Sequence, residues 1–225
     1  MNLPELKIGK LVAQVPIIQG GMAIRLSTAP LAAAVANEGG IGLIAASGMG
    51  LDELRKEIRM ARELTGGKGI IGINAMVAAR QFLDLITTAA EEGIDLIVAG
   101  AGFSRDIFAV GKKYGVEVVP IVSSARLAQT AEKLGASAVV VEGTEAGGHL
   151  GTQQSIKEIL PEVIEAVNIP VIAAGGAIDG NDVAELLKLG ANGVQMGSRF
   201  AASEESNAAP ALKEFYLKMT KEDIV

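Results

Sequence analysis

The sequence predicts an α/β protein in which eight β-then-α units close into a parallel (β/α)8 TIM barrel. Eight short runs rich in Val, Ile and Ala recur along the 225 residues. These runs are apolar throughout instead of alternating, as strands covered on both faces require. Each run is followed by an amphipathic helical pattern. A doubly wound sheet is the structural alternative, but eight units of such even length favour closure into a barrel.

The predicted elements follow one another in a regular order, and we expect them to form one domain over residues 1–225. The clearest helices cover residues 51–64, 124–135 and 180–190, where Leu, Val and Ala recur every three or four positions. Several helices are expected to end at a glycine, because glycine most easily adopts the left-handed C′ conformation. These glycines are Gly93, Gly115, Gly135 and Gly190. The predicted strands cover residues 15–21, 41–47, 70–76, 95–101, 117–123, 137–143, 169–176 and 193–200.

Composition excludes several classes of function. The absence of cysteine excludes a disulfide, a thiolate nucleophile and a cysteine-ligated metal, and a single histidine excludes a histidine-rich metal site. We therefore expect no bound metal. A net charge of −6 and an aromatic content of 3% argue against nucleic acid as a partner.

The hydrophobic content of the chain is expected to be buried in the fold. Hydrophobic residues make up 49% of the sequence, yet no apolar stretch reaches the roughly 20 residues that span a bilayer, so no membrane partner is expected. The first residues show no signal-peptide pattern, which predicts a cytoplasmic location. The high apolar content also favours a homodimer.

Glycine-rich loops mark the predicted site, since the chemistry of such barrels lies at the C-terminal ends of the strands. Four junctions are rich in glycine: "QGGM", "EGTEAGGHLG", "AAGGAIDG" and "QMGSRF". Glycine lets a ligand approach the backbone, and N–H groups at a helix N-terminus attract anions. The pairs Gly175–Gly176 and Gly197–Ser198 follow the seventh and eighth strands, where such barrels commonly bind phosphate. The alternative is that these glycines only make tight turns.

Five motifs carry a family resemblance. In chain order they are "IIQGGMA", "GINAM", "EGTEAGGHLG", "IPVIAAGGAIDG" and "GVQMGSRFAASEES". From about Val15 onward the chain resembles the FMN-dependent nitronate monooxygenases, formerly called 2-nitropropane dioxygenases, and the similar FMN-dependent enoyl-ACP reductases. A histidine behind two glycines is the most specific element. Members of this family continue into a C-terminal lid that covers the flavin, and this chain, which ends with "KEDIV", is expected to lack that segment.

The resemblance implies a noncovalent FMN across the mouth of the barrel. It places Gly21 and Met22 against the isoalloxazine ring and Asn74 within hydrogen-bonding reach of it. From the sixth strand and its loop it adds Glu142, Gly147 and Gly148 as flavin contacts. The phosphate end would be held by Gly175, Gly176, Gln195, Met196, Gly197 and Ser198. Arg199 either adds positive charge there or pairs with a carboxylate in the outer ring of helices.

His149 is the predicted catalytic residue. An imidazole with a pKa near 6.5 can take or give a proton at neutral pH, and a glycine-flanked loop can bring it over a substrate. The resemblance makes His149 the group that orients or deprotonates a nitroalkane, or binds the nitronate. Glu145 in the same loop either orients this histidine or faces water.

Three functions fit these observations. The first is oxidation of alkyl nitronates or nitroalkanes, small-molecule substrates, by O2. The second is an enoyl-ACP reductase that uses NAD(P)H as reductant. The third is a noncatalytic barrel that binds FMN or a phosphate. We favour the monooxygenase, because the "EAGGH" motif is plain and no acyl-carrier site is recognisable.

Overall fold

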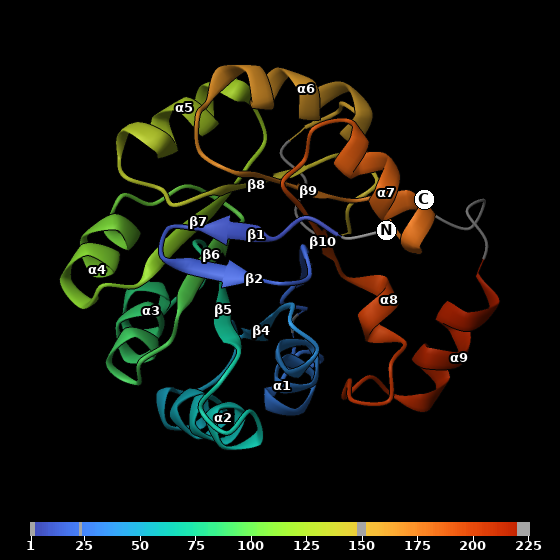
Figure 1. Cartoon of the computed structure of the whole chain (residues 1–225). Coiled ribbons are helices and arrows are strands. Elements are labelled where there is room, and N and C mark those ends of the chain that lie inside the picture. The colour runs from blue at the N-terminus through green and yellow to red at the C-terminus, as the bar shows by residue number, and fades with distance from the viewer. Residues whose placement is uncertain (1–2, 23, 148–151, 220–225) are drawn as a thin grey trace.

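Eight parallel strands form a closed barrel surrounded by helices (Figure 1). The computed structural model describes residues 3–22, 24–147 and 152–219. Neighbours around the barrel follow the order β10-β3-β4-β5-β6-β7-β8-β9. This closure confirms the predicted (β/α)8 barrel and excludes the doubly wound sheet. The strands are β3 (Ile17–Gln19), β4 (Ile41–Ala45), β5 (Ile70–Met76), β6 (Leu96–Gly100), β7 (Glu117–Val122), β8 (Val139–Glu142), β9 (Val171–Ala174) and β10 (Gly193–Met196).

Helices alternate with these strands and cover the outside of the barrel. The four predicted helix-ending glycines have positive φ angles of 76°, 68°, 95° and 104°, in sequence order, which confirms the left-handed ends. Within the described ranges, no helix is long and apolar enough to cross a membrane. The helices are α1 (Ala29–Asn37), α2 (Leu51–Leu64), α3 (Phe82–Glu91), α4 (Asp106–Tyr114), α5 (Ala125–Lys133), α6 (Ile156–Ala166), α7 (Gly180–Lys188), α8 (Ser198–Ala201) and α9 (Pro210–Lys218).

Alternate residues of each strand fill the barrel interior. Val140 of β8 belongs to the interior cluster, whereas its neighbours Val139 and Val141 pack toward the helices. Successive side chains of a strand point to opposite faces. Glu142 therefore faces inward, two positions beyond Val140. The same alternation turns Asn74 of β5 and Gln195 of β10 inward, all three near the C-terminal ends of their strands.

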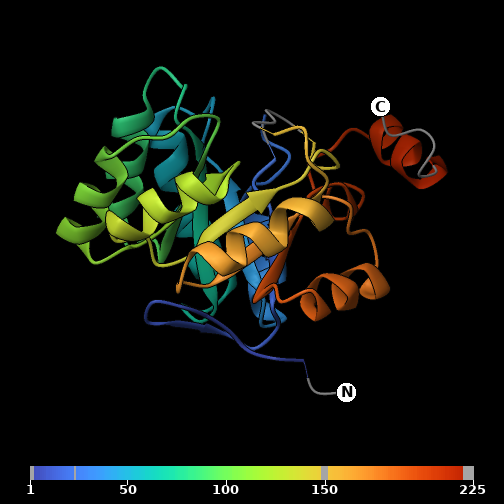
Figure 2. The ribbon, with the colours of Figure 1, turned by 90° about the horizontal axis from the view of Figure 1, so that it is seen from above.

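An antiparallel hairpin closes the N-terminal end of the barrel (Figure 2). Its strands are β1 (Leu6–Ile8) and β2 (Leu11–Ala13), joined through Gly9, which has a φ of 54°. Leu6 is fully buried, and a Cβ on Gly193 would lie 2.8 Å from Leu6 Cδ2. This hairpin was not predicted from the sequence, because two strands of three residues are too short to show a periodicity.

The first and last barrel strands are shorter than predicted. Strand β3 begins at Ile17 and ends at Gln19, inside the predicted range 15–21. Strand β10 ends at Met196, so the prediction that it reaches residue 200 was wrong. Gly197, with φ −111° and ψ −74°, leaves the extended conformation, and helix α8 starts at the next residue. The glycine therefore ends the strand four residues earlier.

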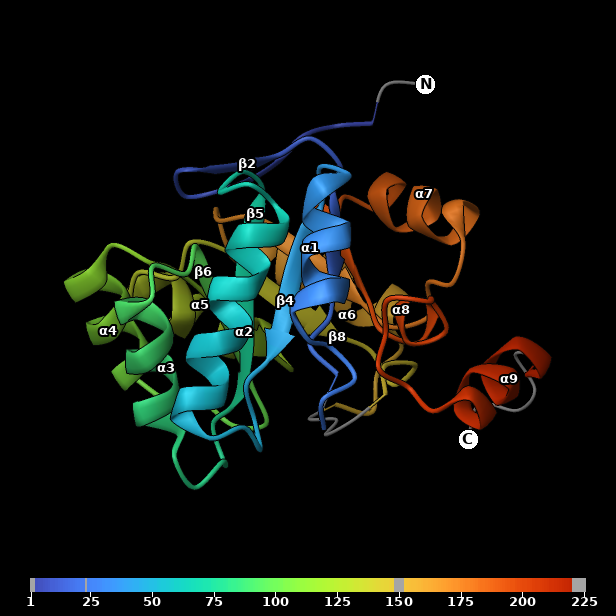
Figure 3. The same cartoon turned by 90° about the horizontal axis from the view of Figure 1, so that it is seen from below.

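The C-terminal helix α9 stands away from the barrel (Figure 3). None of its residues is buried, and the side chains of Phe215 and Leu217 are exposed. The short helix α8 is the element that follows β10 on the barrel surface. The predicted homodimer stays a prediction, although exposed apolar side chains of this kind are compatible with it.

Candidate functional site

The predicted site residues that the structure describes gather at the C-terminal end of the barrel. Gly148 and His149 lie outside the described residues. The others occupy the ends of five strands and the loops that follow. Gly21 and Met22 follow β3, Asn74 lies in β5, Glu142 ends β8 with Gly147 in its loop, Gly175 and Gly176 follow β9, and Gln195, Met196, Gly197 and Ser198 run from β10 into α8.

Two glycines after β3 pass between two inward-facing amide side chains. A Cβ on Gly21 would lie 2.2 Å from Asn74 Cβ, and one on Gly20 would lie 3.3 Å from Gln195 Cγ. The N–H of Gly20 also donates to the carbonyl of Met196 at 2.9 Å. The approach of 2.2 Å at Gly21 leaves no room for a side chain, whereas a Cβ on Gly20 would make a tight contact. The "QGG" sequence thus brings Asn74 and Gln195 to either side of one backbone segment.

A buried polar network, which was not predicted from the sequence, holds the loop after β3. Gln19 and Ser27 are both fully buried. The Nε2 of Gln19 donates to Ser27 Oγ at 3.0 Å, and its Oε1 accepts from the N–H of Leu43 at 3.1 Å. Ser27 Oγ in turn accepts from the N–H of Met22 at 2.9 Å. The available signal was a glutamine at the end of an apolar run, which needs partners when buried.

The loop after β8 is anchored to helix α6 and to the loop after β9. The Oε2 of Glu145 accepts from the N–H of Ile156, the first residue of α6, at 2.9 Å. A Cβ on Gly175 would lie 2.7 Å from the backbone N of Ala146. Neither alternative for Glu145, orienting His149 or facing water, anticipated this contact. The carboxylate stabilises the helix N-terminus, where a negative charge is favourable.

Glu142 and Gln195 are the two polar groups that flank Ala174 in the barrel wall. Both pair in register with Ala174, one from β8 and the other from β10. Burial raises the pKa of the Glu142 carboxyl from its ordinary value of 4.5 to about 7. Gln195 is 8% exposed, and its Oε1 has no hydrogen-bond partner among the described residues. The mouth of the barrel therefore carries polar groups suited to a ligand.

The predicted residues around the end of β10 and the start of α8 do not all point toward the mouth of the barrel. The side chain of Met196 packs in the outer cluster between strands and helices, so it points away from the predicted ligand. Met22 lies near Gly197, since a Cβ there would be 3.8 Å from Met22 Sδ. Arg199 is exposed, and it forms no ion pair within the described part of the chain. Of the two alternatives for Arg199, the ion pair with a carboxylate of the surrounding helices is therefore absent among the described residues.

The backbone beside these residues fits a phosphate. Gly175 and Gly176 are consecutive residues with positive φ, 102° and 74°, a conformation that side chains disfavour. No described residue accepts a hydrogen bond from the N–H of Gly176, Gly197 or Ser198. Free backbone donors and glycine's lack of a side chain are the features by which loops bind anions. A planar ring with polar edges suits the neighbouring Asn74 and Gln195.

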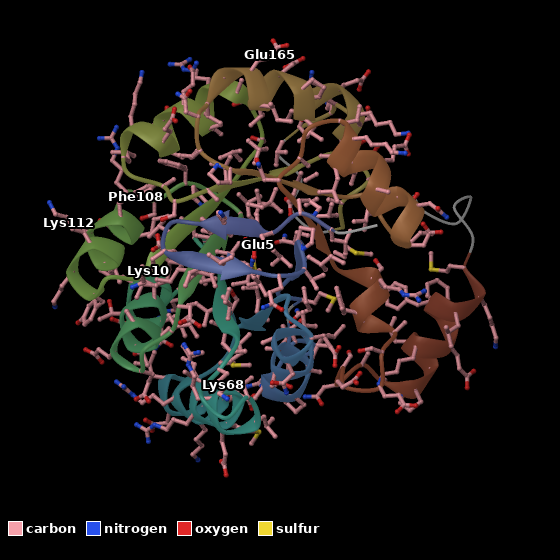
Figure 4. All side chains as sticks on the ribbon, in the orientation of Figure 1. Glu5, Lys10, Lys68, Phe108, Lys112 and Glu165 are labelled. Carbon is pink, nitrogen blue, oxygen red and sulfur yellow. The ribbon has the colours of Figure 1, made fainter. Side chains whose placement is uncertain are left out.

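A cavity of about 450 Å³ lies at the opposite end of the barrel, beside the hairpin. Lys10, Phe108 and Lys112 line it (Figure 4). The carboxylate of Glu117 in its lining is bonded within the protein, since it accepts from the N–H of Lys10 at 3.1 Å and from the hydroxyl of Ser137. The bond from Lys10 attaches the hairpin to β7 of the barrel. The cavity is distant from the predicted site residues and is not the candidate functional site.

Comparison with known proteins decides the family. The family model described as nitronate monooxygenase matches residues 5–225. The chain belongs to the nitronate monooxygenase family. This membership confirms the resemblance inferred from the five motifs, and with it an oxidoreductase family for the chain.

Relatives of this nitronate monooxygenase family member differ in name and are longer. The (3aS,4S,5R,7aS)-5-hydroxy-7a-methyl-1-oxo-octahydro-1H-indene-4-carboxyl-CoA dehydrogenase of Rhodococcus jostii is 35% identical over 93% of this chain. A probable nitronate monooxygenase of Staphylococcus aureus is 33% identical over 93% of this chain and 71% of its own length. The solved structure of FabK from Thermotoga maritima is 40% identical, with a TM-score of 0.88 over 92% of this chain and 66% of that one. The chain spans 58% of the Rhodococcus protein.

Proposed function

We propose that this chain binds FMN noncovalently at the mouth of the barrel and oxidises alkyl nitronates with O2. The observation that carries the proposal is the nitronate monooxygenase family match over residues 5–225. The geometry supports it, because the predicted cofactor residues meet at one end of the barrel. A bound FMN supplies the electron acceptor that no amino-acid side chain provides.

The chain's own residues hold the two ends of the cofactor. Gly175 and Gly176, together with the N–H groups of Gly197 and Ser198, bind the phosphate through backbone donors. Asn74 and Gln195 bind the polar edge of the ring. His149 holds or moves the proton of the substrate carbon, since its imidazole titrates near neutral pH.

Enoyl-thioester reduction with NAD(P)H is the second candidate. The identity of 40% to FabK and of 35% to the indene-carboxyl-CoA dehydrogenase both exceed the 33% identity to the probable nitronate monooxygenase. The name of the second relative includes a CoA thioester. These identities favour an acyl thioester as the alternative substrate class.

The visible absorption spectrum of the purified protein tests the proposal. We expect a yellow protein that is bleached by a nitronate without oxygen and without NAD(P)H. Bleaching by NAD(P)H alone, followed by recovery on addition of an enoyl thioester, supports the reductase instead. A flavin that responds to neither supports the noncatalytic FMN-binding barrel. A colourless protein that does not take up added FMN contradicts the proposal.

Replacing Gly147 by alanine is expected to weaken FMN binding without destabilising the protein. No described atom lies within 4 Å of the Cβ that would be added, so none of the described residues obstructs it. The resemblance places a flavin against this backbone, and a methyl group there would collide with it. We expect the Kd for FMN, measured by fluorescence quenching, to rise at least about tenfold.

Gly180→Ala is the matched control, since no described atom lies within 4 Å of its added Cβ either. It should leave the Kd for FMN unchanged and, since Gly180 is the first residue of α7, raise the free energy of unfolding by no more than about 1 kcal/mol. Unchanged FMN affinity in Gly147→Ala would remove Gly147 from the cofactor site.

Replacing His149 by asparagine is expected to slow turnover of a neutral nitroalkane more than turnover of the preformed nitronate. Only the neutral substrate needs a base, and removing one typically costs about 10²- to 10⁴-fold in rate. Steady-state O2 uptake with both substrates measures the difference, and bound FMN shows that the site is intact. Equal losses on the two substrates would exclude a proton-abstracting role.

A further inference from the structure

Glu142 and Gln195 form a matched pair in the wall of the barrel. Each pairs in register with Ala174, from opposite sides, and each faces inward. Adjacent strands lie about 4.8 Å apart, so the two backbones are separated by about 10 Å across Ala174. Only a methyl group stands between the two longer side chains. Both can therefore reach the same small region of the mouth.

Gln195 presents a hydrogen-bond acceptor to that region. Its side chain is more than nine-tenths buried, and its Oε1 has no partner among the described residues. Buried polar atoms are nearly always hydrogen-bonded in folded proteins. Because Gln195 faces the barrel interior at the C-terminal end of β10, this unpartnered oxygen suits a ligand that supplies an N–H or O–H donor.

Glu142 presents a donor to the same region, because burial favours its neutral form. Burial alone raises its pKa to about 7, and a protonated carboxyl carries one O–H donor. Strand β9 carries no titratable side chain, and Glu117 of β7 lies at the opposite end of its strand. Glu145 of the following loop is bonded to α6. His149 lies outside the described residues.

Charged residues of helix α6, which packs on the outside of β8, are bonded elsewhere or face solvent. Lys157 pairs with Glu185, Glu158 accepts from Ser155, and Glu162 accepts from Gln154. Glu165 is exposed. Among the described residues, therefore, no charge acts on Glu142, and the protonation of this carboxyl depends on its burial.

We infer that neutral Glu142 and Gln195 together recognise the imide edge of the flavin ring, so that flavin binds to the form of the protein with a proton on Glu142. The edge offers a carbonyl oxygen beside an N–H, which matches a carboxyl O–H beside an amide oxygen. This inference rests on the proposed FMN site and assigns these two residues their roles in it. Ionised Glu142 would place a carboxylate against the carbonyl oxygen.

The pH dependence of riboflavin binding tests the role of Glu142. Riboflavin lacks the phosphate group, whose own titration near pH 6 would obscure the result. We expect the Kd of the wild-type protein, measured by fluorescence quenching, to rise about tenfold or more from pH 6.0 to pH 8.5. In Glu142→Gln, which keeps a neutral donor of the same size, the Kd should change less than about twofold.

Methylated flavin tests the role of Gln195. 3-Methylriboflavin lacks the imide N–H, and we expect it to bind the wild type at least about tenfold more weakly than riboflavin. Gln195→Leu should bind the two flavins equally. If flavin binds to wild type and Glu142→Gln with the same pH dependence, the inference is overturned but the proposed function is not. The same holds if methylation weakens binding equally in wild type and Gln195→Leu. Failure of the wild type to bind FMN or riboflavin at either pH overturns the proposed function as well.

Discussion

Replacing Glu142 by glutamine is expected to stabilise the flavin-free protein by about 3 kcal/mol at pH 8.5 and by less than about 1 kcal/mol at pH 5.0. Burial raises the pKa of this carboxyl from 4.5 in the unfolded chain to about 7 in the folded protein. Below pH 4.5 the carboxyl is neutral in both states. As pH rises toward 7 the unfolded chain loses the proton first, so wild-type stability falls until the folded protein also ionises.

Urea unfolding of both proteins at the two pH values, without flavin, measures this difference. Glutamine is neutral at every pH and similar in size to a protonated glutamate. The free energy of unfolding of Glu142→Gln should therefore not show the fall with rising pH that the Glu142 carboxyl causes in the wild type. A control at an exposed carboxylate, Glu165→Gln, should change the free energy of unfolding by less than about 0.5 kcal/mol at either pH. If the gap between wild type and Glu142→Gln is the same at pH 5.0 and 8.5, Glu142 is not desolvated as the structure indicates.

Sequence patterns predicted the barrel well, because parallel strands covered on both faces produce continuous apolar runs. The run at residues 70–76 coincides with β5, and the helix predicted over residues 51–64 coincides with α2. The N-terminal hairpin was missed, since its three-residue strands hold too few side chains to show a period. A local pattern identifies an element only where the element spans several periods.

The sequence predicted where the site residues lie in the barrel but not which atoms they contact. Glycine-rich junctions placed the predicted residues at the correct end of the barrel, since parallel strands share that end. The bond from Glu145 to the start of α6 spans eleven residues, and the outward direction of Met196 depends on strand alternation. Both follow from backbone geometry that motifs do not encode. The hydrogen-bond partners of Gln19 could likewise not be predicted, although a glutamine buried in an apolar strand must have such partners.

Two buried glutamines are expected to respond in opposite ways to replacement by leucine. Gln19→Leu removes the acceptor for the N–H of Leu43 and the donor to Ser27 Oγ, bonds of 3.1 and 3.0 Å. Leaving a buried group without its partner costs about 1–3 kcal/mol, so the two losses together should destabilise the protein by about 2–4 kcal/mol. Ser27, whose Oγ accepts from the N–H of Met22, would also lose its bond from Gln19, so we expect the loop that carries Met22 to be held less firmly and FMN to bind more weakly.

Gln195→Leu should leave the stability of the flavin-free protein unchanged, or raise it by up to about 1 kcal/mol, because the Oε1 that it removes has no partner among the described residues. Both variants should bind FMN more weakly, but only Gln19→Leu should show a lower midpoint in urea. The stability measurement therefore separates a glutamine that supports the fold from one that the fold holds ready for a ligand. Equal destabilisation by the two substitutions would mean that Gln195 is bonded within the protein itself, and its assignment to the flavin edge would then be withdrawn.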